Sequence, residues 1–147
     1  MEIFNNVNDI KTYIIIAYPD SSLASNYNTD TQYPETEMIK ECESFFYYEV
    51  LNWCGCGCSD LAKKTIRDYL EIVRCRHATN RRGTFDRQLK DRFGVTTIYE
   101  SDLLLCLAYT LDAAGFTEHG SSIGSAWLTE EGEMFLWLLK QNAELDS

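Results

Sequence analysis

The sequence has little of the features that mark loop-rich scaffolds, membrane proteins and secreted proteins. Its 147 residues include only two prolines and eight glycines, which disfavours a scaffold made mostly of loops. No apolar run approaches the roughly 20 residues that a membrane-spanning helix needs. Because no basic segment precedes the brief apolar stretch near the start, we do not expect a secretory signal. We therefore expect a cytoplasmic protein.

Familiar catalytic motifs are also missing. The chain has two histidines, and it contains neither the His-Glu-x-x-His motif of zinc proteases nor the deaminase pattern of His-x-Glu with a later Cys-x-x-Cys. No Gly-rich phosphate loop and no Ser/His/Asp constellation can be recognised. We therefore expect that the protein is not an enzyme, and a small hydrolase with an open metal site is the alternative.

The chain does have enough apolar material for a core. Its composition is 45% hydrophobic and 13% aromatic, which is typical of a globular protein rather than a disordered one. A length of 147 residues suits one domain. No internal repeat, low-complexity tract or linker divides the sequence, so we expect residues 1–147 to form a single domain.

Charge is distributed unevenly along the chain, whose net charge is −10. Residues 1–50 carry nine acids and two bases, or −7, and residues 93–147 carry nine acids and one base, or −8. Residues 63–92 carry ten bases and four acids, or +6. Because an acidic surface repels DNA and attracts basic protein surfaces, we expect a protein partner and no direct binding of nucleic acid.

Hydrophobic spacing predicts a mainly α (α+β) domain with about five helices. The stretch 101–114 is apolar nearly all round, which is typical of a central helix in a bundle. The predicted helices cover 34–53, a segment from Ser59 to a break at 78–84, 85–93, 101–114, and a last segment that Thr129 caps.

Three further segments are predicted to be non-helical. The β-branched residues over 12–18 indicate a short strand. The segment 19–34 is rich in Ser, Asn, Asp and Thr, which indicates a surface loop. The Gly/Ser turns within 116–128 indicate a small β-hairpin or an ordered loop.

Three of the six cysteines, Cys54, Cys56 and Cys58, fall within five consecutive positions, with a glycine in each gap. Tetrahedral zinc holds thiolates about 2.3 Å away, and residues at i and i+2 of a turning segment can reach one ion. The glycines let the backbone curl around the metal, and the following helix stabilises thiolates with its positive end. The cluster predicts a structural zinc that ties the domain together. The alternative is a set of small buried thiols.

A closed structural zinc site usually needs a fourth ligand. His119 is the first candidate, because its polar, Gly-rich loop can aim the side chain freely. His77, two residues after Cys75, is a second candidate at the end of a helix, and a Glu or Asp side chain is a third. We expect Cys42 and Cys106, which follow helical patterns, to lie in the core.

Two segments carry a resemblance to known proteins. "LNWCGCG" at 51–57 and "TEHGSSIGSAWLTEEG" at 117–132 resemble small proteins encoded by phages of Gram-positive bacteria, over roughly residues 45–75 and 105–140. In size, acidity and metal motif the chain is similar to zinc-containing anti-CRISPR proteins of the type II class. The resemblance implies a non-enzymatic inhibitor that binds the RNA-guided effector nuclease and hinders the loading or cleavage of target DNA.

The resemblance also implies particular site residues. It carries over Cys54, Cys56 and His119 as zinc ligands, whereas Cys58 rests on its spacing alone. In this setting the protein would act in the host bacterial cytoplasm. The alternative is a zinc-stabilised regulator of winged-helix type that binds nucleic acid, favoured by the order of hairpin, Leu-Thr-x-x-Gly and apolar helix near the end of the chain.

Four glutamates in the helix predicted over 34–53 are candidates for contact with a basic partner. Glu37 and Glu41 are four residues apart, so they share one side of a helix. Glu35 and Glu43 add to the same acidic segment. An acidic face of this kind speeds association with a basic surface and loses its effect as salt screens it.

Protein purified without added metal is expected to contain about one zinc per chain by elemental analysis. Cys54→Ser or Cys56→Ser should remove the metal and lower the melting temperature sharply, because the binding energy of a structural zinc is folding energy. Cys42→Ser is the matched control, since a thiol in the core should not affect the metal.

For the fourth ligand, His119→Ala should weaken zinc binding far more than His77→Ala, measured by competition with a chelator. Equal losses, or a larger loss at His77, would reassign the ligand. A fully folded protein that holds no metal would refute the site.

Overall fold

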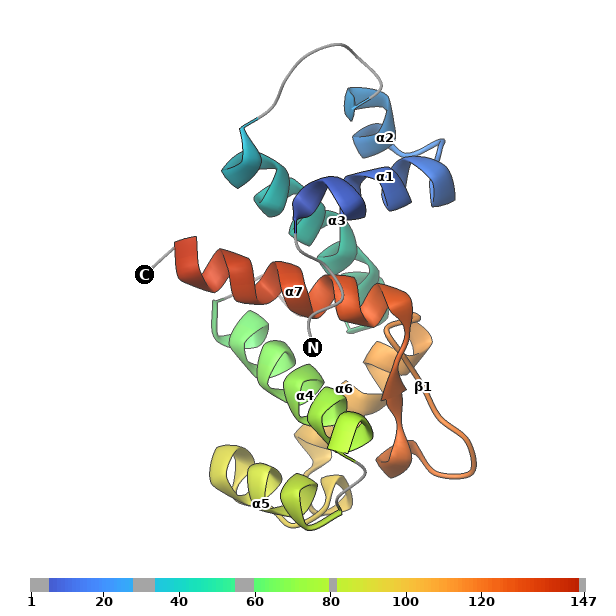
Figure 1. The fold of residues 1–147 in the computed structure, drawn as a ribbon. Helices are drawn as coiled ribbons and strands as arrows, with labels where there is room; N and C mark the ends of the chain where they lie inside the picture. Colours follow the sequence, from blue (N-terminus) through green and yellow to red (C-terminus); the bar gives the residue numbers. More distant parts are fainter. Residues whose placement is uncertain (1–5, 28–33, 55–59, 80–81, 146–147) are drawn as a thin grey trace.

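The computed structural model describes residues 6–27, 34–54, 60–79 and 82–145. These residues form seven α-helices, two 3₁₀ helices (η1, η2) and one antiparallel pair of strands (Figure 1), which confirms the predicted mainly helical fold with a small β element. No described helix combines the length and apolar character that crossing a membrane requires. In chain order the elements are α1 (Val7–Ala17), α2 (Ser22–Tyr27), α3 (Glu35–Cys54), α4 (Asp60–Thr79), α5 (Arg82–Phe93), η1 (Ile98–Glu100), α6 (Asp102–Ala113), β1 (Thr117–Glu118), η2 (Ile123–Ser125), β2 (Trp127–Leu128) and α7 (Glu130–Leu145).

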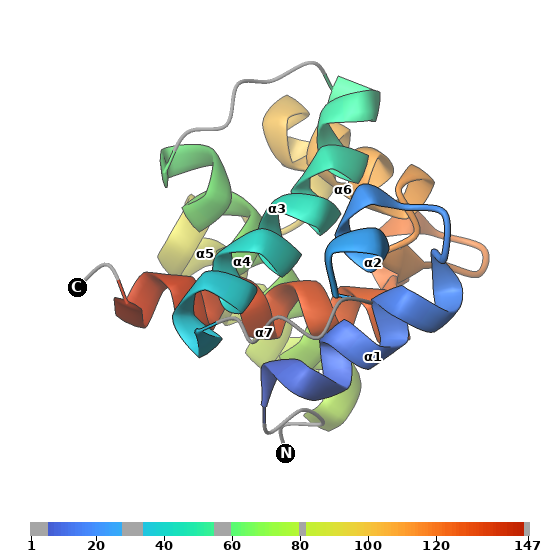
Figure 2. The ribbon, with the colours of Figure 1, turned by 90° about the horizontal axis from the view of Figure 1, so that it is seen from above.

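Helix α7 lies across the middle of the molecule and packs against both α3 and α4 (Figure 1). The six consecutive residues from Met134 to Leu139 are all buried. A helix that is apolar on every side must be covered on every side, and the neighbouring elements do this. The view from above shows α1 and α2 on one side of α3, and α4 and α5 on the other (Figure 2).

An aromatic cluster joins α7 to α3 and to the segment before β1. The ring centroids of Phe116 and Phe135 are 4.7 Å apart, and that of Phe46 lies 5.9 Å from Phe116 and 6.2 Å from Phe135. All three side chains are almost completely buried. Tilted and edge-to-face pairs of this kind add stability beyond the burial of apolar area, so the cluster fixes how α7 sits on α3.

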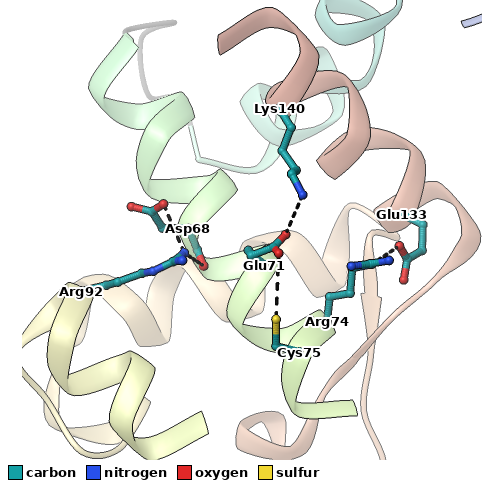
Figure 3. A network of polar contacts seen from close by, with 7 residues as sticks. All are labelled: Asp68, Glu71, Arg74, Cys75, Arg92, Glu133 and Lys140. Carbon is teal, nitrogen blue, oxygen red and sulfur yellow. Dashed lines mark hydrogen bonds and ion pairs between the residues drawn. The ribbon is translucent and has the colours of Figure 1, made fainter. Parts of the chain in front are cut away.

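Polar contacts connect α4 to its neighbours on two sides (Figure 3). Arg74 on α4 donates to Glu133 on α7 at 3.0 Å, and both side chains are about four-fifths buried. Lys140 on α7 lies 3.6 Å from Glu71. Towards α5, Arg92 lies 3.4 Å from Asp68. Partly buried charged hydrogen bonds are stronger than exposed ones, so the Arg74 pair is the stronger of the two ion pairs that join α4 to α7.

The predicted hairpin within 116–128 is confirmed. Thr117 pairs with Leu128 and Glu118 pairs with Trp127 in antiparallel register. The predicted cap of the last helix is also confirmed, because Thr129 Oγ1 accepts from the backbone N–H of Gly132 at 3.1 Å. The same hydroxyl donates to the carbonyl oxygen of Gly115 at 2.7 Å, which fastens the hairpin to the start of α7.

The other predicted helices are confirmed with small changes of boundary. Helix α3 covers the segment predicted over 34–53, and α5 begins before the predicted residue 85. Gly94, with φ of 73°, follows the last residue of α5 and ends the helix. Ser101 caps α6 by accepting from the backbone N–H of Leu104 at 3.2 Å. Ser59, where the second helix is predicted to begin, lies outside the described residues.

The strand predicted over 12–18 is wrong, because residues 12–17 belong to helix α1 and Tyr18 is its C-cap. Val7, Ile10 and Ile14 are completely buried, and their spacing of three and four residues places them on one side of a helix. Asn6 caps the helix by accepting from a backbone N–H at 3.2 Å. The burial of this side against α2 and α3 outweighs the preference of β-branched residues for strands.

The loop predicted over 19–34 contains a short helix, α2, so that prediction is wrong for its first half. Ser21 Oγ accepts from the backbone N–H of Ala24 at 3.1 Å and so caps α2. Leu23, Ala24 and Tyr27 are buried. The Ser21 cap and the spacing of these three buried residues both indicate a helix. The Ser- and Asn-rich composition of the segment favoured a loop instead and led to the wrong prediction. Residues 28–33 lie outside the described residues.

Helix α6 is not the central helix that its composition predicts. Only Leu104, Ala108 and Leu111 are buried in it, at steps of four and three residues. Leu103 is 66% exposed and Tyr109 is 54% exposed. One side of α6 therefore covers the core, and its other side presents apolar side chains to solvent.

Gly132 is expected to tolerate no side chain, because a Cβ there would lie 2.0 Å from the carbonyl oxygen of Phe116. Gly132→Ala should lower the free energy of unfolding by about 3 kcal/mol, which for a chain of this length corresponds to a fall of roughly 10 °C in melting temperature. Thermal unfolding followed by circular dichroism measures the change.

Gly120→Ala is the matched control, because nothing lies within 4 Å of a Cβ at that position. Its melting temperature should stay within about 2 °C of the original. If the two variants unfolded at the same temperature, the close packing of α7 against the backbone of Phe116 would be contradicted.

Candidate functional site

The predicted zinc ligands fall mostly where the structure gives no account of side chains. Cys54 is the last residue of α3, but its side chain lies outside the described part of the chain, as do Cys56 and Cys58. Among the described residues, no group of three or more His, Cys, Asp or Glu side chains is placed to hold a metal ion.

His119 follows β1 and is exposed. Its Nδ1 lies 2.9 Å from Oδ1 of Asp112, in the last turn of α6. The same carboxylate oxygen accepts from Thr117 Oγ1 at 3.5 Å. A histidine that binds a metal through one ring nitrogen usually donates the other N–H to a carboxylate or a carbonyl. The Asp112 contact therefore orients the ring in a way that suits metal binding through Nε2. The side chain of His77, on α4, lies outside the described residues.

The two cysteines predicted to lie in the core differ in burial. Cys42 is completely buried, which confirms its prediction. Burial raises the pKa of its thiol to about 11. Cys106 is exposed, so its prediction is wrong. It lies on the side of α6 that faces away from the core, and periodicity could not reveal this in a helix with apolar residues all round.

The four candidate glutamates on α3 do not share one exposed face. Glu35 and Glu37 are exposed. Glu41 is half-buried and accepts from the hydroxyl of Tyr27 at 3.0 Å. Glu43 is only 2% exposed, and both of its carboxylate oxygens lie 3.1 Å from Nζ of Lys63. Of the four candidates, Glu35 and Glu37 are therefore the exposed pair, because Glu41 is half-buried and Glu43 turns into the protein, where it pairs with Lys63.

An apolar groove of about 310 Å³ lies between the end of α3, the start of α4 and the exposed side of α6. We call it the α6 groove. Two leucines form prominent parts of its walls and are largely exposed, Leu61 at 74% and Leu103 at 66%. Exposed apolar side chains gathered around one hollow are typical of a surface that binds another molecule. The described residues that line the α6 groove are Tyr47, Val50, Leu61, Ala62, Thr65, Ile66, Leu103, Cys106, Leu107 and Thr110.

Helix α6, which forms one wall of the α6 groove, carries acidic residues and no basic ones. No charged residue is among its described lining, but α6 carries Asp102 and Asp112 and no Lys or Arg. Glu100 lies just before α6, and hydrogen bonds from Thr96 lower the pKa of its carboxyl. Asp102 directly precedes Leu103 in the sequence, so one acid of α6 neighbours a residue that lines the groove.

Comparison with protein-family models, with curated proteins and with solved structures found no match. Sequence reasoning missed the α6 groove, because its walls come from three helices and the exposure of Leu61 and Leu103 depends on how those helices pack. The available signal was a helix predicted at 101–114 that had no polar side to face solvent.

At about pH 8, an alkylating reagent is expected to modify Cys106 in the folded protein and to leave Cys42 unmodified. The thiolate is the reactive form, and Cys42 is buried with a pKa raised to about 11. Because this folded pKa lies above that of an unfolded thiol, near 8.5, the stabilisation from the neutral Cys42 thiol is complete below about pH 8. It is lost as the pH rises towards 11.

Mass spectrometry of chymotryptic peptides measures modification of the two thiols separately. In denaturant both should react, which provides the control. Equal rates for Cys42 and Cys106 in the folded protein would contradict the packing of α3 in the core.

Proposed function

We propose that the chain is a non-enzymatic phage protein that binds and inhibits a host defence protein, and that the α6 groove is its contact face. The observation that carries the proposal is an exposed apolar groove, one wall of which is formed by a helix that carries two acids and no base. Interfaces commonly combine an apolar centre, which gains from exclusion of water, with a polar rim that sets orientation and specificity. Leu61 and Leu103 would supply the centre, and Asp102 would belong to the rim.

The charge of the chain favours a basic partner. No base is present on α6, and residues 93–147 carry nine acids against one base. A suitable partner would present apolar side chains surrounded by positive charge. The acidic chain would attract such a surface before contact, over a distance of several ångströms. The exposed Glu35 and Glu37 on α3 add to this attraction without lining the α6 groove.

The particular partner we propose is the RNA-guided effector nuclease of a type II CRISPR system in the host cytoplasm. Such nucleases hold nucleic acid in positively charged channels, which a protein of net charge −10 can occupy or obstruct. The resemblance of the cysteine cluster and of residues 117–132 to phage proteins supports this choice. Inhibition would then consist of hindering the loading or cleavage of target DNA.

A structural zinc bound by Cys54, Cys56, Cys58 and His119 remains part of the proposal. The contact between Asp112 and His119 supports it, because this pairing leaves Nε2 for a metal. The cysteine segment joins α3 to α4, and both helices contribute walls to the α6 groove. Zinc bound there would fix the spacing of those two helices, and so the width of the groove.

A winged-helix regulator is the second candidate, because α6 is followed by the β1–β2 hairpin and then by another helix. In such regulators the helix before the hairpin usually enters the major groove of DNA. Here that helix has two acids and no base, and the phosphate backbone would repel it. This charge favours the protein-binding proposal over the DNA-binding one.

Leu103→Lys should weaken binding to the effector nuclease at least tenfold, which is about 1.4 kcal/mol. The change removes apolar area from the α6 groove and adds a positive charge towards a basic partner. Ile16→Lys on α1 is the matched control, because Ile16 is 74% exposed and does not line the groove. Biolayer interferometry with the guide-loaded nuclease measures both affinities.

Three outcomes would count against the proposal. Equal affinity of the two lysine variants would remove the α6 groove from the interface. Salt-sensitive binding to DNA alone would favour the winged-helix candidate, and destruction of nuclease, guide or DNA at substoichiometric amounts would indicate an enzyme.

Reversal of Glu35 and Glu37 to lysine should slow association and leave the zinc content unchanged.

A further inference from the structure

A second cavity, of about 470 Å³, opens between α3, α4 and α7, and the proposed inhibitor function does not use it. We call it the α4 cleft. Four of the 13 Lys and Arg residues of this acidic chain line it, and Glu43 is the one acid among its described lining residues. The four basic residues are Lys40, Lys63, Lys64 and Arg67.

One of the four cations is held in a fixed position. Both carboxylate oxygens of Glu43 lie 3.1 Å from Nζ of Lys63. The same ammonium group lies 5.5 Å from the centroid of the Tyr47 ring, within range of a cation–π contact. Because Glu43 is only 2% exposed, this pair forms a rigid part of the cleft wall and orders an ammonium donor there.

Lys64 and Arg67 add further positive charge to the cleft. Lys64 lies 3.6 Å from Asp68, but its side chain is 63% exposed, so the contact is a weak surface pair. Arg67 forms no ion pair with any residue that the structure describes. Cations gathered around one hollow repel one another, and an anion bound between them would relieve that repulsion.

We propose that the α4 cleft binds a small phosphorylated molecule of nucleotide size. Its volume lies in the range of ligand pockets, roughly 300–1,000 Å³. The guanidinium of Arg67 can bind a phosphate through two parallel hydrogen bonds, and the lysines add charge and further donors. Leu139 and Ala143 on α7 line the same cleft and provide an apolar surface for a ring. This lining therefore combines donors for a phosphate group with an apolar surface, as a nucleotide requires.

A small molecule fits the α4 cleft better than a strand of nucleic acid, because acidic residues neighbour the cations in the protein sequence. Glu37 and Glu41 lie on either side of Lys40 on α3, and Glu144 directly follows Ala143 on α7. A long polyanion leaving the cleft past these helices would meet negative charge, whereas a ligand contained within it would not. The cations thus form a confined site rather than an extended track.

Isothermal titration of the full-length protein with ATP, pyrophosphate, adenosine and a single-stranded RNA of about ten nucleotides tests the proposal. ATP should bind, pyrophosphate should bind more weakly, and adenosine should not bind. Arg67→Ala should weaken ATP binding at least tenfold. Arg87→Ala on α5 is the matched control, because Arg87 is exposed and does not line the cleft, and it should change affinity less than twofold.

Thermal unfolding should show that both variants are folded. Loss of the titration signal in Arg67→Ala would then report loss of the contact with the ligand. No binding of ATP at about millimolar concentration, or equal binding by Arg67→Ala and the original protein, would overturn the proposal. Pyrophosphate binding as tightly as ATP would overturn the nucleotide assignment. RNA binding far more tightly than ATP, with the same loss in Arg67→Ala, would replace it with a nucleic-acid site.

Discussion

The burial of α7 is the constraint on which the rest of the structure depends. Six apolar residues in a row leave this helix no side that can face water, so it must be enclosed. Helices α3 and α4 pack against it, and the Phe46–Phe116–Phe135 cluster sets its position. At Gly132 the helix approaches the backbone of Phe116 so closely that only a glycine fits. Both candidate sites are therefore built in part on α3 and α4, the two helices that pack against α7.

Helix α4 shows how one amphipathic segment can serve two surfaces of opposite character. Leu61 and Thr65 line the apolar α6 groove, and Lys63, Lys64 and Arg67 line the α4 cleft. Because residues three or four apart share a side of a helix, this division follows from the order of side chains along α4. The α4 cleft is therefore lined mainly by cations on a chain of net charge −10, whereas no described lining residue of the α6 groove is charged.

The fold could be predicted from the sequence wherever one signal dominated. The apolar stripe and Thr129 cap gave the correct start for α7, and the Gly/Ser turns between apolar ends marked the hairpin. Prediction failed where a local preference competed with packing, as in α1, where β-branched residues favoured a strand but buried Ile10 and Ile14 required a helix. It failed again for α6 and Glu43, because exposure is a property of how helices are assembled and leaves no pattern in a single segment.

The sequence by itself determined the helical class, the hairpin, the acidic flanks around a basic middle, and the cysteine cluster that predicts zinc. These follow from the spacing and chemistry of neighbouring residues, which any folded arrangement must respect. Only the tertiary structure decided that Glu43 turns inward to Lys63, that Cys106 is exposed, and that Asp112 meets His119. It also decided the two cavities, because each is bounded by three helices that the burial of apolar area brings together.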